Sequence, residues 1–163
     1  MWKKTNLIYL VIFILLINFN TFADTEQIQI VEKYLTLKEV RSHTSFDFEE
    51  IGFARLAGLS GPRFKKDIYD KAVKEVENFL KTAVNKDGKL KVGLHTSVTI
   101  DSKGTERTYH YVIIYGNNTT LNEFAVKKGI AYTNTHTKNY FDNEKMKALE
   151  KEAKDAKLYH WAE

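Results

Sequence analysis

Segments with strand-like alternation come before any segment with helical spacing in this chain. Gln27 to Leu37 and Ser45 to Arg55 alternate apolar and polar residues, as half-buried strands do, although Val31 onward also allows a helix. Lys89 to Ile100 and Thr108 to Tyr115 follow as two further strands, and the last is apolar enough to predict burial on both faces. Because strands and helices do not alternate regularly, the sequence predicts an α+β protein built on a small Greek-key barrel.

Three segments show the spacing of amphipathic helices. Apolar residues recur at helical intervals from about Arg63 to Val84, and Pro62 suits the first turn of this helix because no amide hydrogen is needed there. Thr120-Leu121-Asn122-Glu123 is a capping box for a short helix, which Gly129 is expected to end in the left-handed conformation. A last helix is predicted from about Asp142 to Ala156.

The N-terminus has the pattern of an export signal. Two lysines precede an apolar run from Leu7 to Ile17, and Thr21-Phe22-Ala23 provides small residues at a cleavage site. The run is shorter than the roughly 20 residues that a spanning helix needs, although an uncleaved membrane anchor is the alternative. We therefore expect residues 1–23 to be a signal peptide cleaved after Ala23. Residues 24–163 would then form one secreted or periplasmic domain without a membrane span.

Composition excludes several classes of function. Hydrophobic residues make up 43% of the chain, so it can bury a core, and it has no cysteine. A disulfide scaffold, a zinc finger and a thiol nucleophile are therefore excluded. The net charge of +4 falls to +2 without the two leader lysines, which permits a polyanionic partner but does not require one. The five histidines show no metal-ligand spacing and are interpreted as solvated.

Three segments resemble staphylococcal-nuclease-like (thermonuclease) domains in order and spacing. The first segment, Arg55 to Arg63, resembles the family's Arg-Leu-x-Gly-Ile-Asp-x-Pro-Glu segment. Its glycines and proline predict a loop from Ala57 to Pro62. Leu121 to Ala131 is similar to its Val-Asn-x-x-Leu-Val-x-x-Gly-Leu-Ala helix, and Glu150 to Trp161 to its terminal helix end. The resemblance implies a five-stranded OB-fold barrel with about three packed helices, and calcium-dependent hydrolysis of DNA and RNA.

The resemblance also implies a phosphate clamp made of two arginines. Arg55 matches the first family arginine directly. Arg107 matches the second if the following turn is longer than in the family, whereas the alternative register puts Tyr109 at that position. The tyrosines between Tyr109 and Tyr115, together with two lysine pairs, are candidates for a cationic and aromatic groove that binds single strands.

The acidic residues of the family's active site have no counterpart here. Ser60 stands where the family has an aspartate, and Arg63 where it has the glutamate that acts as general base. Arg41-Ser42-His43-Thr44-Ser45 matches the family's Asp-Gly-Asp-Thr stretch without a carboxylate. A guanidinium cannot accept a proton at physiological pH, and a hydroxyl is a poor calcium ligand. Asp47 and Glu49 are the remaining candidate metal ligands, but alternation predicts that both point outward.

These observations lead to one expectation and two alternatives. We expect an exported, monomeric, thermonuclease-like pseudoenzyme that needs no cofactor and binds single-stranded DNA or RNA, or another polyanion, around Arg55, Arg63 and Arg107. The first alternative is an active calcium-dependent phosphodiesterase that uses Asp47 or Glu49. The second is an envelope protein-interaction module in which the arginines are structural, with Arg55 paired to one of those acids.

Overall fold

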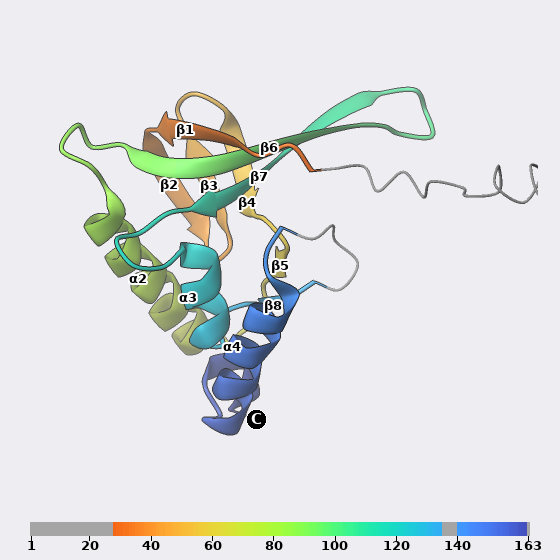
Figure 1. Cartoon of the computed structure of the whole chain (residues 1–163). Helices are drawn as coiled ribbons and strands as arrows, with labels where there is room; N and C mark the ends of the chain where they lie inside the picture. Colours follow the sequence, from red (N-terminus) through yellow and green to blue (C-terminus); the bar gives the residue numbers. More distant parts are fainter. Residues whose placement is uncertain (1–27, 135–139, 163) are drawn as a thin grey trace, which may run out of the picture.

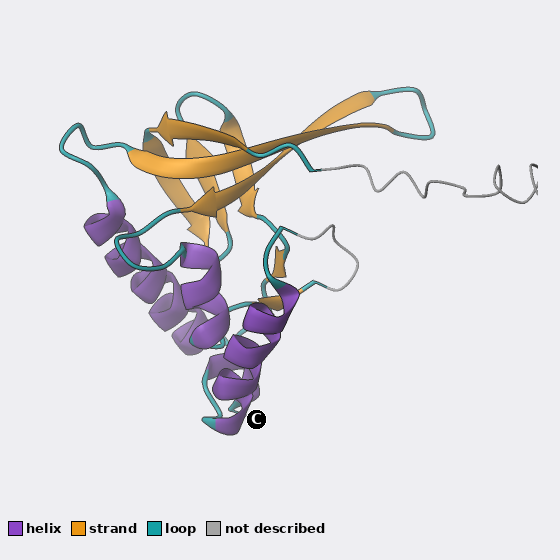
Figure 2. Cartoon of the chain, viewed as in Figure 1, coloured by secondary structure: helices purple, strands orange, loops and turns teal. Residues whose placement is uncertain are grey.

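The structure is a computed structural model that describes residues 28–134 and 140–162. The predicted signal peptide, with its cleavage site after Ala23, lies outside the described residues, as does His136. The described part of the chain contains a curled six-stranded sheet, a two-stranded sheet and three α-helices (Figures 1 and 2). The predicted α+β class is therefore confirmed.

The six-stranded sheet is curled so that its two edges approach each other (Figure 1). Its members are β1 (Val31–Leu35), β2 (Leu37–Ser42), β3 (Ser45–Phe48), β4 (Gly52–Leu56), β6 (Leu90–Ile100) and β7 (Glu106–Ile114). The strand order is β1-β6-β7-β4-β3-β2, and only β4 and β7 pair in parallel. Thr36 alone separates β1 from β2, yet these strands occupy the two opposite edges of the sheet. The sheet must therefore curl until its edges approach each other, which produces the predicted barrel.

The sheet has six strands where five were predicted, because the first strand of the barrel breaks at Thr36. The Thr36 amide donates to both carboxylate oxygens of Glu50, at 3.1 and 2.9 Å. The Thr36 carbonyl accepts a hydrogen bond from the Glu49 amide at 3.0 Å. The β3–β4 turn therefore satisfies the backbone groups of the residue at which the chain changes edges.

The core lies between the inner face of the sheet and the helices. Leu90, Val92 and Leu94 alternate along β6 toward this core, and Phe46 and Phe48 do the same on β3. The helix α2 (Lys66–Ala83) buries a stripe of Ala72, Val76 and Leu80 against them. This helix begins three residues later than predicted, since Lys65 is its N-cap, and Pro62 therefore lies before the helix rather than in its first turn.

The remaining helices begin and end at the signals that the sequence carries. The capping box of Thr120 and Glu123 is present at the start of α3 (Leu121–Lys127), and Gly129 adopts a φ of +69° after it. Asp142 caps α4 (Asn143–Asp155), which is followed by the 3-10 helix η1 (Tyr159–Trp161). These predictions are confirmed because capping depends on residues close together in the sequence.

A buried amide ties α3 to the barrel. The Asn122 side chain is fully buried; its amide donates to the carbonyls of Ala57 and Val112, and its oxygen accepts from the Ile114 amide. These bonds fix the end of β4 and the loop that follows it against β7.

The loop predicted for Ala57 to Pro62 contains a short strand. There β5 (Leu59–Ser60) pairs with β8 (Tyr132–Thr133) in a two-stranded sheet. The prediction was wrong because Gly58 and Gly61 flank β5 instead of interrupting it, and the partner strand is more than 70 residues away in the sequence.

The outer halves of β6 and β7 extend beyond the barrel as a two-stranded ribbon (Figure 1). This ribbon, formed by Ser97–Ile100 and Glu106–Tyr109, is exposed for most of its length, and Ile100 is 74% exposed. The prediction that the strand from Thr108 to Tyr115 is buried on both faces was therefore wrong for its first half. Burial is limited to Val112–Ile114, where β7 lies inside the sheet.

Candidate phosphate-binding cleft

A row of polar side chains crosses the outer face of the barrel at Arg55. Alternation along β4 sends Ala54 and Leu56 into the core, so Arg55 between them points outward. Strand pairing places Arg55 opposite Tyr111 of β7 on one side and Ser45 of β3 on the other. The row continues to His95 on β6, which pairs with Tyr111, and to Ser42 on β2, which pairs with Ser45.

A cleft of about 490 Å³ opens beside this row, between the main sheet and the two-stranded sheet. Its volume lies within the usual range of ligand sites. Its polar lining is mainly small hydroxyl groups, those of Ser42, Thr44, Ser45 and Ser60. Arg55 is the single formally charged residue among the described residues that line the cleft, and none of them is Asp or Glu. The cleft can therefore bind an anion, but its lining offers no carboxylate.

Arg55 is exposed, and within the described part of the chain no carboxylate pairs with it. Its guanidinium carbon lies 5.6 Å from the centroid of the Phe53 ring, in a cation–π contact. The predicted alternative, a structural pair with Asp47 or Glu49, is not formed. Asp47 instead accepts a hydrogen bond from Arg41 at 2.7 Å. A phosphate would thus meet Arg55 without breaking an ion pair of these described residues.

Arg107 lies on the same face of the sheet but further out along the ribbon. It lies four positions before Tyr111, a distance of about 13 Å along an extended strand. Arg107 donates to Asp101 at 3.1 Å and does not line the cleft. Its proposed role as the second member of a phosphate clamp stays a prediction.

The two positions at which the family's acids are replaced differ in their placement. Ser60 lines the cleft from β5, whereas Arg63 is exposed and is absent from the lining. The extra positive charge that Arg63 brings therefore lies beside the cleft rather than inside it.

Neither candidate metal ligand contributes to the cleft. Asp47 lies on the outer face of β3, between the core residues Phe46 and Phe48, as alternation predicted, but it is only 9% exposed because the Arg41 guanidinium covers it. Asp47 in turn raises the pKa of Arg41. Glu49 is exposed in the β3–β4 turn and lines a separate depression with Asp47. Among the residues placed by the structure, no group of three or more His, Cys, Asp and Glu side chains is arranged to hold a metal ion.

His43 is a buried residue behind the cleft that the sequence did not reveal. It is 5% exposed, and its ring lies 5.2 Å from Phe64 and 5.6 Å from Tyr69, so its interpretation as a solvated histidine was wrong. Neither ring nitrogen has a hydrogen-bond partner among the described residues, and burial lowers its pKa to about 4. Because the residues that cover it come from α2 and the segment before it, no local pattern could have predicted this burial.

Two tyrosines on the cleft are stacked on histidines. Tyr111 of β7 stacks on His95, with ring centroids 6.2 Å apart and an interplanar angle of 27°. Tyr132 of β8 stacks on His160, with centroids 5.3 Å apart and an angle of 25°. Tyr140 completes a three-ring cluster with the first pair, and burial raises its pKa to about 12.

The curled barrel, its packed helices and the arginine cleft on its outer face define an OB-fold α+β protein with a nuclease-like architecture. A family model described as staphylococcal nuclease homologue matches residues 54–163, more than half of the chain. The chain therefore belongs to the staphylococcal nuclease homologue family, as its motifs predicted. The match includes Arg55 and Arg107 but begins after Asp47 and Glu49. No curated protein matches the sequence.

The helices of residues 28–134 and 140–162 do not have the character of membrane spans. None of the helices there combines the length and the apolar character needed to cross a bilayer.

Proposed function

We propose that this protein binds single-stranded nucleic acid in the Arg55 cleft and has lost efficient phosphodiester hydrolysis. One observation carries the proposal: the cleft presents, among hydroxyl groups, a guanidinium that pairs with no described carboxylate, and no carboxylate is found among its described lining residues. A guanidinium fork and hydroxyl donors match the oxygens of a phosphodiester. Carboxylates in the same place would repel the anion unless a cation were bound between them.

The aromatic side chains at the cleft favour a single strand over a duplex. Phe53, Tyr111 and Tyr132 line the cleft together with Arg55. Unpaired bases stack on such rings, whereas the bases of a duplex are already stacked on each other. The formal net charge is only +4 for the whole chain, and +2 without the two leader lysines, which favours binding at this local site over a general attraction to polyanions.

The residues present do not fit the calcium-dependent chemistry of the family. Calcium binds through several oxygen ligands with charged carboxylates among them, and the described cleft offers neutral oxygens only. A general base is also missing from the described lining, because Arg63 cannot accept a proton and His43 is buried away from solvent. Loss of a positioned base alone slows such reactions by about 10²- to 10⁴-fold.

We further propose that the protein acts outside the cytoplasm as a monomer after cleavage at Ala23. The pattern of residues 1–23 supports export and cleavage, and the monomeric state stays a prediction. N-terminal sequencing of protein recovered from the producing cells would give Asp24 as the first residue. A first residue at Met1 would contradict cleavage.

The test is an incubation with labelled single-stranded DNA, with calcium or with a chelator, scored for retention and for degradation. We expect retention that falls as salt rises, no dependence on calcium, and intact DNA. Arg55→Gln should weaken binding by about tenfold or more, Arg63→Gln and Arg107→Gln by less, and the exposed control Lys74→Gln by no measurable amount.

Two results would overturn the proposal in different ways. Cleavage that requires calcium and stops with a chelator would identify an active phosphodiesterase with a rearranged set of acids. Absence of salt-dependent binding would favour a protein-interaction module in which the arginines are structural.

A further inference from the structure

The cleft is bordered by one tyrosine from each of the two sheets. Tyr111 comes from β7, next to Arg55 in the main sheet, and Tyr132 comes from β8, opposite Ser60 in the two-stranded sheet. Both side chains are partly exposed. The guanidinium of Arg55 and the small hydroxyl groups occupy the same cleft. An anion bound at Arg55 would therefore have an aromatic ring available on each of the two bordering sheets.

Each tyrosine is held in place by a histidine outside the cleft lining. The His95 ring behind Tyr111 is fixed by a contact of 3.2 Å between its Nδ1 and the Gln29 carbonyl. The His160 ring behind Tyr132 lies 4.4 Å from the Trp161 ring, and the His160 amide donates to the Gly129 carbonyl at 3.2 Å. Rings held in this way lose little conformational entropy when a ligand stacks on them.

We propose that Tyr111 and Tyr132 bind the two bases on either side of the phosphate held by Arg55. The unit that the cleft recognises is then a single-stranded dinucleotide. This inference rests on the proposed function and adds to it the size of the ligand and the residues that contact its bases. Stacking of one base on one aromatic side chain contributes about 1–3 kcal/mol. Removal of either tyrosine ring should therefore weaken binding between about fivefold and a hundredfold.

The test uses three ligands that differ only in their bases. They are the thymidine dinucleotide d(TpT) and its two abasic isomers, one without the 5′ base and one without the 3′ base. Binding is measured by nuclear magnetic resonance titration of the isotope-labelled protein, which can follow weak affinities. The unaltered protein should bind d(TpT) between about fivefold and a hundredfold more tightly than either isomer.

Two substitutions then assign the bases to the rings. Tyr111→Leu and Tyr132→Leu should each weaken d(TpT) binding. Each substitution should leave unchanged the affinity for the isomer that already lacks the base bound by that ring. The isomer whose affinity is unchanged should therefore differ between the two substitutions. Tyr111→Phe and Tyr132→Phe keep the ring and should retain the binding. Tyr34→Leu, at an exposed tyrosine of β1 outside the cleft, is the matched control.

The outcomes separate this inference from the proposed function. Salt and Arg55→Gln should weaken the binding of all three ligands if the proposed function holds. If they do so but neither tyrosine substitution changes an affinity, the inference is overturned and the proposed function stands. The same conclusion follows if both tyrosine substitutions leave the affinity for the same isomer unchanged. If no ligand binds the unaltered protein, the inference is overturned, and the retention assay with longer single-stranded DNA decides the proposed function separately. If the leucine variants fail to fold, as shown by thermal melting, the unaltered protein still decides: equal affinity for d(TpT) and both isomers overturns the inference.

Discussion

His43 combines a buried position with an unsatisfied polar ring. The ring is packed between Phe64 and Tyr69, and its nitrogens have no partner among the described residues. Desolvation therefore favours the neutral imidazole, which explains why its pKa falls to about 4 from an ordinary value of 6.5. The free energy of unfolding should therefore depend on pH between these two pKa values.

We expect the free energy of unfolding to decrease as the pH falls from 6.5 to 4. In this window the unfolded chain binds a proton at His43 that the folded protein does not, so the contribution of His43 is fully present above pH 6.5. The loss should approach about 3 kcal/mol at the lower limit. Urea unfolding of the protein and of His43→Phe at several pH values measures it. Identical pH profiles for the two proteins would contradict the prediction, because the lowered carboxylate pKa values of Glu50 and Glu150 affect both equally.

Position 61 requires a glycine because His43 lies too close to it to leave room for a side chain. A Cβ atom at Gly61 would lie 2.6 Å from His43 Nε2 and 2.9 Å from Thr44 Oγ1. Gly61→Ala should therefore lower the free energy of unfolding by about 1–3 kcal/mol, through overpacking. In a His43→Ala background the same substitution should cost less, because the nearest atom has been removed. An equal cost in both backgrounds, measured by urea unfolding, would show that the contact is not the cause.

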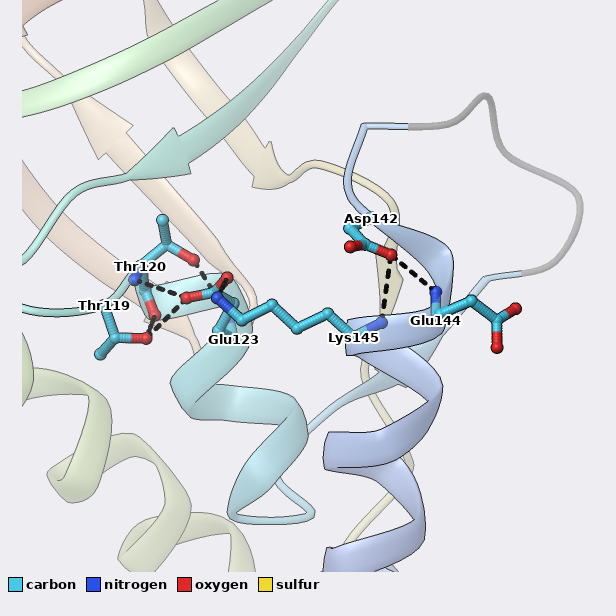
Figure 3. A network of polar contacts seen from close by, with 6 residues as sticks. All are labelled: Thr119, Thr120, Glu123, Asp142, Glu144 and Lys145. Atoms are coloured by element: carbon cyan, nitrogen blue, oxygen red, sulfur yellow. Dashed lines mark hydrogen bonds and ion pairs between the residues drawn. The ribbon is translucent and has the colours of Figure 1, made fainter.

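At the scale of elements, helix α3 begins in a polar network that also holds α4 (Figure 3). Glu123 accepts hydrogen bonds from the Thr119 hydroxyl at 2.7 Å and the Thr120 amide at 3.3 Å, and it forms an ion pair with Lys145 of α4. These partners hold the pKa of Glu123 below its usual value even though burial acts in the opposite direction. One carboxylate thus caps one helix and anchors another.

Glu123→Ala should lower the free energy of unfolding by about 1–2 kcal/mol, because it removes half of a capping box and the link to α4. Glu144→Ala is the matched control: its side chain is 84% exposed and pairs with Lys147 on the same helix. Such an exposed pair contributes less than about 0.5 kcal/mol. Chemical unfolding of both variants checks the prediction, and equal effects would refute the anchoring role of Glu123.

The elements with local signals were predictable, and those with remote partners were not. The capping box at Thr120 and the left-handed Gly129 each depend on a few neighbouring residues, and both were predicted. The pairing of Ser60 with Tyr132 and the break at Thr36 depend on residues far along the chain. The same distinction applies to the site: the motif identified Arg55 and Ser60, whereas the burial of His43 required the tertiary fold.

At the scale of the whole molecule, the barrel and the ribbon differ in how much packing supports them. Inside the barrel, Leu90–Leu94 pairs with β1 and β7 and lies over the helices. In the ribbon, β6 from Ser97 to Ile100 pairs with β7 alone, and most of its side chains are exposed. The same two strands therefore pass from a packed environment into solvent.

Amide hydrogen exchange should divide β6 and β7 at this boundary. Amides bonded between the strands in the ribbon should exchange through local opening at low free-energy cost, while those of Leu90–Leu94 and Val112–Ile114 should require global unfolding. Exchange followed residue by residue by nuclear magnetic resonance measures both. Uniform protection along β6 would contradict this division and would indicate that something covers the ribbon.

The junction at Thr36 has a consequence for the order in which a growing chain can fold. The segments β2, β3 and β4 follow one another along the chain and can pair locally, whereas β1 pairs with Leu90–Leu94, nearly 60 residues later. Until Leu90–Leu94 is available, β1 lacks the strand with which it pairs in the folded protein, and the barrel cannot close. Closure of the barrel is thus a late event in biogenesis, set by the distance between two paired strands along the chain.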